Sequence, residues 1–261
     1  MKIRTVSVCG VNVQALKLQD LHSLIQTAVR SKEKYIIANH NLHSLYLYHK
    51  EPKMRDFYAK ANYVHIDGMA LVFIGRLLGK PLSRDHRVTY IDWTDPLMKE
   101  AEENGYRIFF LGSKPGVADK ARRILAERYP GLQMEVAHGY FNAAAGSDEC
   151  RQILDRIRAF SPHILMVGMG MPRQEEWILE NFSEISANAI LTAGACMDYV
   201  AGEVPTPPRW LGRIGLEWLY RLLSEPGRLW RRYLIEPWFI GKLLLKELIY
   251  RKNLKDKGLS S

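Results

Sequence analysis

The chain has 261 residues, of which 47% are hydrophobic and 25% are charged. This composition can bury a sizeable core and argues against a disordered protein. The formal charge is +9, and residues 203–261 carry two-thirds of that excess, with twelve Lys or Arg against six Asp or Glu. The same stretch holds four of the six tryptophans. Basic side chains interleaved with Trp indicate an anionic partner, either lipid headgroups or nucleic-acid phosphates.

Cysteine usage and apolar runs suggest where the protein works. Cys9, Cys150 and Cys196 form neither a CxxC pair nor a metal-binding spacing, which is typical of a reduced intracellular protein. The N-terminus has no apolar segment followed by a small-residue cleavage site. No apolar run reaches the roughly 20 residues of a membrane span. We therefore expect neither a signal peptide nor a transmembrane helix.

Short β-rich runs alternate with helical patterns before residue 200. The first run, residues 6–13, is either an antiparallel hairpin or an edge strand. The strands predicted after it are 35–39, 63–67, 107–112, 134–140, 163–170 and 188–195. Helical periodicity covers 115–129 and 147–160. This alternation predicts βαβ units, and therefore an α/β fold with a mostly parallel sheet.

The pattern changes near Gly202. Three prolines between residues 205 and 208 predict an extended linker, because proline fixes φ and lacks an N–H. Two Glu-Pro dipeptides, at 225–226 and 236–237, then divide the remainder into two or three short amphipathic helices. We therefore expect an α/β core over 1–202 and a basic, Trp-rich helical appendage over 203–261.

Polar and glycine-rich segments follow all six predicted core strands. They are residues 39–41, 67–68, 112–116, 138–140, 168–175 and 194–198. Because the carboxyl ends of parallel strands lie at one edge of a sheet, these segments should come together there, where α/β folds bind ligands. The sequence therefore predicts a ligand site on that edge.

Two of these segments are glycine loops. Gly112 and Ser113 open a loop that leads into a helix, whose free N–H groups suit a phosphate. The same residues also fit an ordinary strand-to-helix turn. Gly168 and Gly170 form a GxG fragment, but without the third glycine of a dinucleotide fingerprint the signal is weak.

Two acidic residues allow two interpretations each. Asp67 ends an apolar strand and can take a proton from a substrate hydroxyl, or it can cap the helix that begins near Met69. Asp198 can bind a ribose or a base, or it can serve as a cap. No HxxxH pair and no DxD motif appears, so we expect no dedicated metal site.

The motifs as a set resemble one known family. They are DGMALVF (67–73), RVTYID (87–92), FLGSKPGVA (110–118), VGMGMPRQEEWI (167–178), GACMDYVAG (194–202) and GLEWLYRLLSEPGRLWRRY (215–233). In this order they resemble the WecG/TagA/CpsF glycosyltransferases, glycosyltransferase family 26, from about Asn39 to Tyr233. The resemblance implies a Rossmann-like catalytic core and a membrane-associating appendage.

The resemblance also implies an activity. It is an inverting transfer, without a metal cofactor, from a UDP-sugar to an undecaprenyl-diphosphate-linked sugar in the synthesis of a bacterial cell-surface polysaccharide or teichoic acid. The transferred sugar would be a hexose or an N-acetylhexosamine such as N-acetylmannosamine. The implied partners are the UDP-sugar, the lipid-diphosphate-linked acceptor and an anionic membrane surface at the cytoplasmic face, with no nucleic acid. A homo-oligomer, dimer or trimer, is an option that the resemblance leaves open.

Residue roles follow from the resemblance by motif. Asp67 corresponds to the general base. Arg87 and Gln174 correspond to groups that position the acceptor or steady the departing diphosphate, and Arg221 lies in the appendage that closes over the site. Asn39 and Asn41 align with a T-x-N pattern of the family, and Tyr140 and Asp198 match positions associated with uridine binding. Together with Gly112, Ser113, Gly168 and Gly170 of the glycine loops, they are the predicted substrate- and UDP-binding residues. Tyr90 stands where the family usually has Gly, and Asn39 where it usually has Thr, which leaves the identity of the sugar open.

Two other functions fit parts of the sequence. A nicotinamide-dependent oxidoreductase would use the same sheet edge, but the GxGxxG fingerprint is incomplete and lacks its acidic partner about 20 residues later. A non-enzymatic membrane- or nucleic-acid-binding module would explain the Trp- and Arg-rich appendage. It would leave the polar loops of the core without a role.

Overall fold

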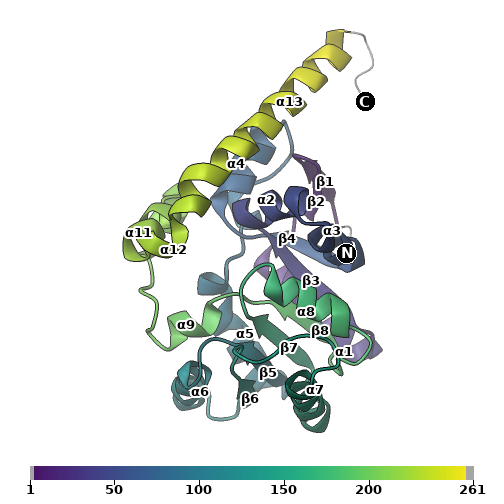
Figure 1. Cartoon of the computed structure of the whole chain (residues 1–261), viewed down its shortest axis with the longest axis vertical. Helices are drawn as coiled ribbons and strands as arrows, with labels where there is room; N and C mark the ends of the chain where they lie inside the picture. The colour runs from purple at the N-terminus through teal and green to yellow at the C-terminus, as the bar shows by residue number, and fades with distance from the viewer. Residues whose placement is uncertain (1–2, 257–261) are drawn as a thin grey trace.

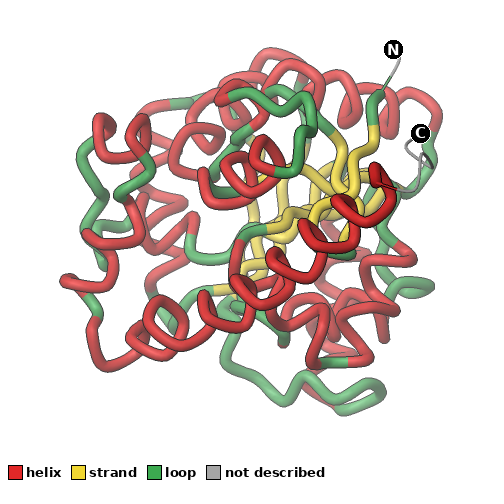
Figure 2. Tube along the Cα trace, turned by 90° about the horizontal axis from the view of Figure 1, so that it is seen from above, coloured by secondary structure: helices red, strands yellow, loops and turns green. Residues whose placement is uncertain are grey.

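The computed structural model describes residues 3–256, except for the side chains of Arg209, Arg213 and residues 254–256. Six strands form one all-parallel sheet in the order β4-β3-β8-β7-β5-β6, with helices on both faces (Figures 1 and 2). The strands are β3 (Tyr35–His40), β4 (Tyr63–Ile66), β5 (Arg107–Gly112), β6 (Gln133–Ala137), β7 (Ile164–Gly168) and β8 (Ala189–Thr192). The predicted Rossmann-like α/β fold is confirmed, and each of the six predicted core strands is present.

Side chains that alternate along the strands feed two apolar clusters, one on each face. In β5, Phe109 points into one cluster and Phe110 into the other. One face is covered by α1 (Leu18–Ser31), α5 (Tyr90–Asn104), α6 (Val117–Arg128) and α9 (Cys196–Val200). The opposite face is covered by α2 (Leu42–Lys50), α3 (Pro52–Lys60), α4 (Met69–Leu77), α7 (Asp148–Phe160) and α8 (Arg173–Asn181). Both faces of the sheet are therefore buried, as a parallel sheet requires.

The first run of the chain is a hairpin, not an edge strand of the main sheet. β1 (Thr5–Val8) and β2 (Val11–Gln14) pair antiparallel, and Cys9 and Gly10 form the turn with positive φ angles of 49° and 85°. The buried side chains of the hairpin join the same cluster as α2, α3 and α4. The hairpin thus extends the core on that face.

The appendage is more continuous than the sequence predicted. Its elements are α10 (Arg209–Ile214), α11 (Glu217–Ser224), α12 (Pro226–Trp230), a π turn η2 (Arg231–Ile235) and α13 (Glu236–Asp256). The expectation that Glu236-Pro237 ends a helix is wrong. The N–H of Glu236 bonds the carbonyl of Arg231, five residues back, so the ladder changes register directly before Pro237, which has no N–H to donate.

α13 is also not the amphipathic helix that was expected, because both of its sides are apolar. Ile240 is buried in the core cluster, whereas Trp238, Leu245 and Ile249 are exposed. The helix packs along α2 and projects beyond the sheet (Figure 1). Among residues 3–256, no helix combines the length and the apolar character needed to cross a bilayer.

Candidate active site

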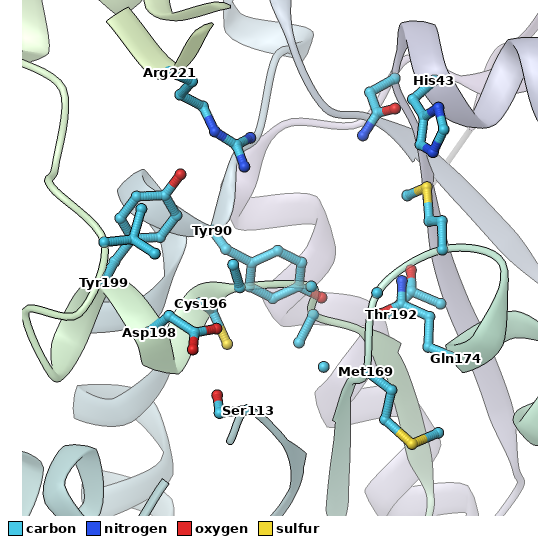
Figure 3. Close-up of a pocket in the computed structure, with 18 of the residues that line it drawn as sticks. His43, Tyr90, Ser113, Met169, Gln174, Thr192, Cys196, Asp198, Tyr199 and Arg221 are labelled. Atoms are coloured by element: carbon cyan, nitrogen blue, oxygen red, sulfur yellow. The ribbon is translucent and has the colours of Figure 1, made fainter. Parts of the chain in front are cut away.

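A cavity of about 780 Å³ lies at the carboxyl edge of the sheet. All six strands contribute to it through the residues at or just after their ends, namely Asn39, Asp67, Ser113, Tyr140, Gly168 and Thr192. Side chains of α11, α12 and η2 complete the wall opposite the sheet, and Arg221 points into the space above Tyr90 (Figure 3). The predicted convergence of the polar loops therefore occurs, and the appendage takes part in the same cavity.

Ten of the twelve predicted site residues line this cavity. The lining residues are Asp67, Gln174, Arg221, Asn39, Asn41, Ser113, Tyr140, Gly168, Gly170 and Asp198. Gly112 and Arg87 do not. Gly112 lies beneath the wall, and the guanidinium of Arg87 bonds Asp92 and Glu217 instead of facing the cavity.

The glycines of the loops allow the strand ends to approach one another. A Cβ on Gly112 would lie 2.3 Å from the carbonyl oxygen of Gly168, its partner in the sheet. A Cβ on Gly168 would lie 2.4 Å from the carbonyl oxygen of Gly194. Both distances are far below van der Waals contact, so these positions accept only glycine. The glycines shape the floor whether or not a phosphate binds there.

Asp67 is not the cap of α4. Gly68, with φ at 102°, occupies the N-cap position, and no side chain among the described residues caps that helix. Instead Asp67 Oδ2 accepts a 3.3 Å hydrogen bond from Asn41 Nδ2, and its own N–H donates to the carbonyl of His40. Asn41 in turn caps α2 through Ser44. The helix start after β3 thus orients the carboxylate that follows β4.

Two buried amides present their carbonyl oxygens as acceptors. Asn39 Nδ2 donates to the carbonyl and the hydroxyl oxygen of Thr192, at 2.8 and 3.2 Å. Gln174 Nε2 donates to Glu175 Oε1 at 2.7 Å. Neither Asn39 Oδ1 nor Gln174 Oε1 has a partner among the described residues. Because an unsatisfied buried acceptor is costly, a ligand that donates hydrogen bonds fits this part of the wall.

Glu175 and its neighbours form a buried polar layer near these amides. Glu175 is fully buried, and burial raises its pKa to about 7. The hydroxyl of Tyr58 donates to the carbonyl of Asn39 at 2.8 Å, and its ring stacks on His40 at 3.8 Å between ring centroids. Burial lowers the pKa of His40 to about 3, so this imidazole is neutral. The layer fixes β3 and α8 behind the cavity.

Asp198 and Ser113 lie opposite each other at the other end of the cavity (Figure 3). Asp198 stands in the first turn of α9, and burial raises its pKa. Ser113 follows β5 with a positive φ of 59°, an uncommon conformation for a residue other than glycine. Tyr140 is 60% exposed beside them. This end offers a carboxylate, a hydroxyl and an aromatic ring.

Most carboxylates on the cavity wall are already paired. Glu203, Glu217, Glu225 and Glu236 contact Lys120, Arg87, Arg228 and His43, respectively, each within 3 Å. Asp67 and Asp198 are the two cavity carboxylates that lack a basic partner within 4 Å among the described residues. They are therefore the carboxylates available to a ligand.

Three arginines of the appendage lack a carboxylate partner among the described residues. They are Arg221, Arg231 and Arg232, and all three line the cavity. The guanidinium of Arg221 lies 5.9 Å from the centre of the Tyr199 ring, and its Nε is buried without a partner. Burial lowers the pKa of Arg232. Because an unpaired buried guanidinium is unfavourable, an anionic ligand would be stabilised here.

Several cavity residues were not found from the sequence. His43, Thr192, Tyr199, Glu217 and Glu236 all line the wall. Glu236 had been interpreted only as half of a helix-ending Glu-Pro pair, although its carboxylate accepts from His43 Nδ1 at 2.8 Å. A Glu directly before Pro at the start of a helix can also accept a hydrogen bond from a neighbouring helix. The Glu-Pro dipeptide was therefore the sequence signal that could have identified Glu236.

Comparison with known proteins identifies the family of the chain. The sequence profile of the family described as "Glycosyl transferase WecG/TagA/CpsF family" matches residues 6–253. Curated relatives from Staphylococcus aureus strains MW2 and COL are 28% identical over 208 residues, which cover 76% of this chain and 79% of each relative. Both are named N-acetylglucosaminyldiphosphoundecaprenol N-acetyl-beta-D-mannosaminyltransferase. The chain belongs to the WecG/TagA/CpsF family of glycosyltransferases.

Proposed function

We propose that the protein transfers an N-acetylhexosamine of the N-acetylmannosamine type from a UDP-sugar to a sugar carried on undecaprenyl diphosphate. The names of the relatives support this acceptor and this sugar. The observation that carries the proposal is the charge pattern of one cavity. It combines an unpaired carboxylate that can act as a base with three unpaired arginines that can hold a diphosphate.

In the proposed mechanism, Asp67 removes the proton of the acceptor hydroxyl as its oxygen attacks the anomeric carbon. UDP leaves from the opposite face of the sugar, so an α-linked donor gives a β-linked product. Asn41 orients the carboxylate of Asp67 through their hydrogen bond. A base that must be near its proton and correctly aimed gains from such a fixed partner.

The departing diphosphate needs positive charge. Arg221, Arg231 and Arg232 supply it from the appendage, and this stabilisation is strongest where water is excluded. We propose that no metal ion is required. The proposed nucleotide end contains Ser113, Tyr140 and Asp198.

The appendage is also the proposed membrane contact. Sixteen large hydrophobic side chains are exposed among the described residues, and all but Tyr140 lie on α4 or between Trp210 and Tyr250. Apolar and Trp side chains beside Lys and Arg are typical of segments that lie on an anionic bilayer. We propose that this surface holds the protein at the cytoplasmic face, where a lipid-linked acceptor can reach the cavity.

One experiment tests the activity. The protein is incubated with an undecaprenyl-diphosphate-linked N-acetylglucosamine acceptor and a panel of UDP-sugars, and the lipid product is identified by mass. We expect an added N-acetylhexosamine from one donor. No product with any UDP-sugar would refute the proposal. Family membership already favours this function over an oxidoreductase or a non-enzymatic binding module.

A further inference from the structure

A buried arginine, Arg87, connects α11, the helix that carries Arg221, to the core. Arg87 Nη1 bonds Asp92 Oδ2 at 2.9 Å, and its Nη2 bonds Glu217 Oε1 at 2.5 Å. The side chain of Arg87 is only 11% exposed, and that of Glu217 is 21% exposed. Asp92 belongs to α5 of the core and Glu217 to the first turn of α11. The guanidinium therefore bridges the two parts of the molecule.

Gly212 provides the room for this bridge. A Cβ at that position would lie 2.4 Å from Glu217 Oε1 and 2.9 Å from Arg87 Nη2. Gly212 lies inside α10 and does not line the cavity. Glycine destabilises the interior of a helix. The close approach of the ion pair explains why a glycine nevertheless stands in α10. The ion pair of Arg87 and Glu217 therefore packs directly against the backbone of α10 at Gly212.

The bridge acts on Arg221 through the geometry of α11. Glu217 and Arg221 are four residues apart and so lie on the same face of the helix. The first of them is held by the core, and the second points into the cavity (Figure 3). Among the described residues, no hydrogen bond or ion pair holds the Arg221 side chain, whose guanidinium lies 5.9 Å from the centre of the Tyr199 ring. Its place over Tyr199 is therefore set by where α11 lies.

We infer that Arg87 is a positioning residue, whose ion pair with Glu217 fixes α11 and thereby sets where Arg221 stands over the cavity. The inference rests on the proposed function, in which Arg221 holds the departing diphosphate. It assigns to Arg87 an action through the appendage, not a contact with the acceptor. Loss of the bridge then lowers turnover by displacing Arg221.

The variant that tests this is Gly212→Ala, because it removes no charged or cavity-lining group. Its matched control is Gly241→Ala in α13, where a Cβ would meet nothing within 4 Å. Backbone hydrogen exchange over residues 217–224, measured without substrate, should be faster in Gly212→Ala and unchanged in the control. Turnover should fall about tenfold, as expected for a displaced stabilising group. A thermal melt of each variant confirms that it is folded.

A double-mutant comparison separates positioning from direct contact. If the bridge acts through Arg221, Gly212→Ala and Arg87→Ala lower turnover little further in a protein that already carries Arg221→Ala. Fully additive losses would overturn the inference and assign Arg87 to the substrate. Glu217→Gln, which keeps the shape but weakens the pair, is the second variant should Gly212→Ala fail to fold.

Two further results are decisive. Unchanged exchange over residues 217–224, together with turnover within about twofold of wild type, would refute the positioning role. If the wild-type protein transfers no sugar but Gly212→Ala still shows faster exchange, the proposed function is refuted and the bridge itself is supported. The exchange measurement therefore distinguishes the failure of one proposal from the failure of the other.

Discussion

The carboxyl edge of the sheet and the C-terminal appendage form one cavity, but they are built by different means. At the sheet edge, the residues are positioned by core packing, because both faces of the strands are buried and the close approach at the glycines leaves no room for a side chain. In the appendage, α13 packs on the core through Ile240, whereas α11 and η2 bury no side chain, and ion pairs of Glu217 and Glu236 connect the appendage to the core. Packing determines where the residues of the sheet edge lie. The roof of the cavity, formed opposite the sheet by α11, α12 and η2, is positioned by a small number of polar contacts.

This difference suggests a division of labour. A base must be aimed within a fraction of an ångström, and the packed edge can provide that accuracy for Asp67. Positive charge for a leaving group is needed only once the donor is bound. Arg221, Arg231 and Arg232 come from α11 and η2, which bury no side chain, and in the proposed mechanism they would close over a substrate and release a product.

The largest effect should come from the packed edge. Asp67→Asn keeps the size of the side chain and its place beside Asn41 but removes the proposed base, and such a loss typically lowers the rate by about 10²–10⁴. UDP affinity should change little, because the carboxylate acts on the acceptor. Initial rates of sugar transfer and calorimetric titration with UDP measure both quantities. Asp119→Asn, an exposed carboxylate on α6, is the control, and equal rates for the two variants would remove Asp67 from the mechanism.

The next effect should come from the roof. In an assay with a short-chain, soluble acceptor, Arg221→Ala should lower turnover by about 10–10², since one preorganised group that stabilises the leaving charge is missing. Vesicle binding should fall only slightly. Lys246→Ala, which changes a basic residue of α13 outside the main cavity, should leave the rate intact. A normal rate for Arg221→Ala would reduce the appendage to an anchor.

The same division explains what the sequence could predict. Buried strands, glycine loops and the order of β-rich runs are local signals, and they predicted all six strands and the sheet edge that holds nine of the ten predicted site residues in the cavity. The tenth, Arg221, was given by the family resemblance. Asp67 remained ambiguous between base and helix cap. The structure rules out the cap because Gly68 takes that position, a distinction of one residue that helix signals cannot resolve.

The appendage was predicted less well because its structure depends on distant partners. Glu236-Pro237 resembles a helix end, yet a π turn before it lets the helical path continue, and the carboxylate of Glu236 bonds His43, which is 193 residues earlier in the chain. Arg87 was placed in the site by resemblance, whereas its guanidinium reaches Glu217 across 130 residues. No local pattern carries such long-range pairs.

A smaller effect should appear at the outer surface of the appendage. Trp238 is 77% exposed on α13, so Trp238→Ala should weaken sedimentation with anionic vesicles by about fivefold, which corresponds to ~1 kcal/mol for partial burial of an aromatic side chain. Binding of the wild type should also weaken as salt rises, because screening shortens the reach of the basic residues. Tyr140→Ala, an exposed aromatic outside the appendage, should bind vesicles normally. Equal losses for both variants would contradict a membrane face on α13.

The smallest effect concerns the buried layer behind the sheet edge. Burial raises the pKa of Glu175 from 4.5 to about 7, so between these pH values the folded protein keeps a proton that the unfolded chain has released. Stability from this group is therefore present below pH 4.5 and is lost as the pH rises to about 7. Glu175→Gln removes this loss. Its free energy of unfolding relative to wild type, measured by denaturant titration at each pH, should rise across that interval and then level off, by an amount on the order of 1–3 kcal/mol.

Buried His40 and His65 titrate in the opposite sense, since burial lowers the pKa of each and their stabilisation is lost as the pH falls below 6.5. They are present in both proteins, so the difference between variant and wild type cancels their contribution. Glu180→Gln, an exposed position on α8 beside Lys53, should give a nearly flat difference, because surface pairs contribute little. A flat difference for Glu175→Gln as well would mean that Glu175 is charged in the folded protein. Its charged carboxylate would then accept the hydrogen bond from Gln174 Nε2, and the buried layer behind the packed edge would hold a negative charge.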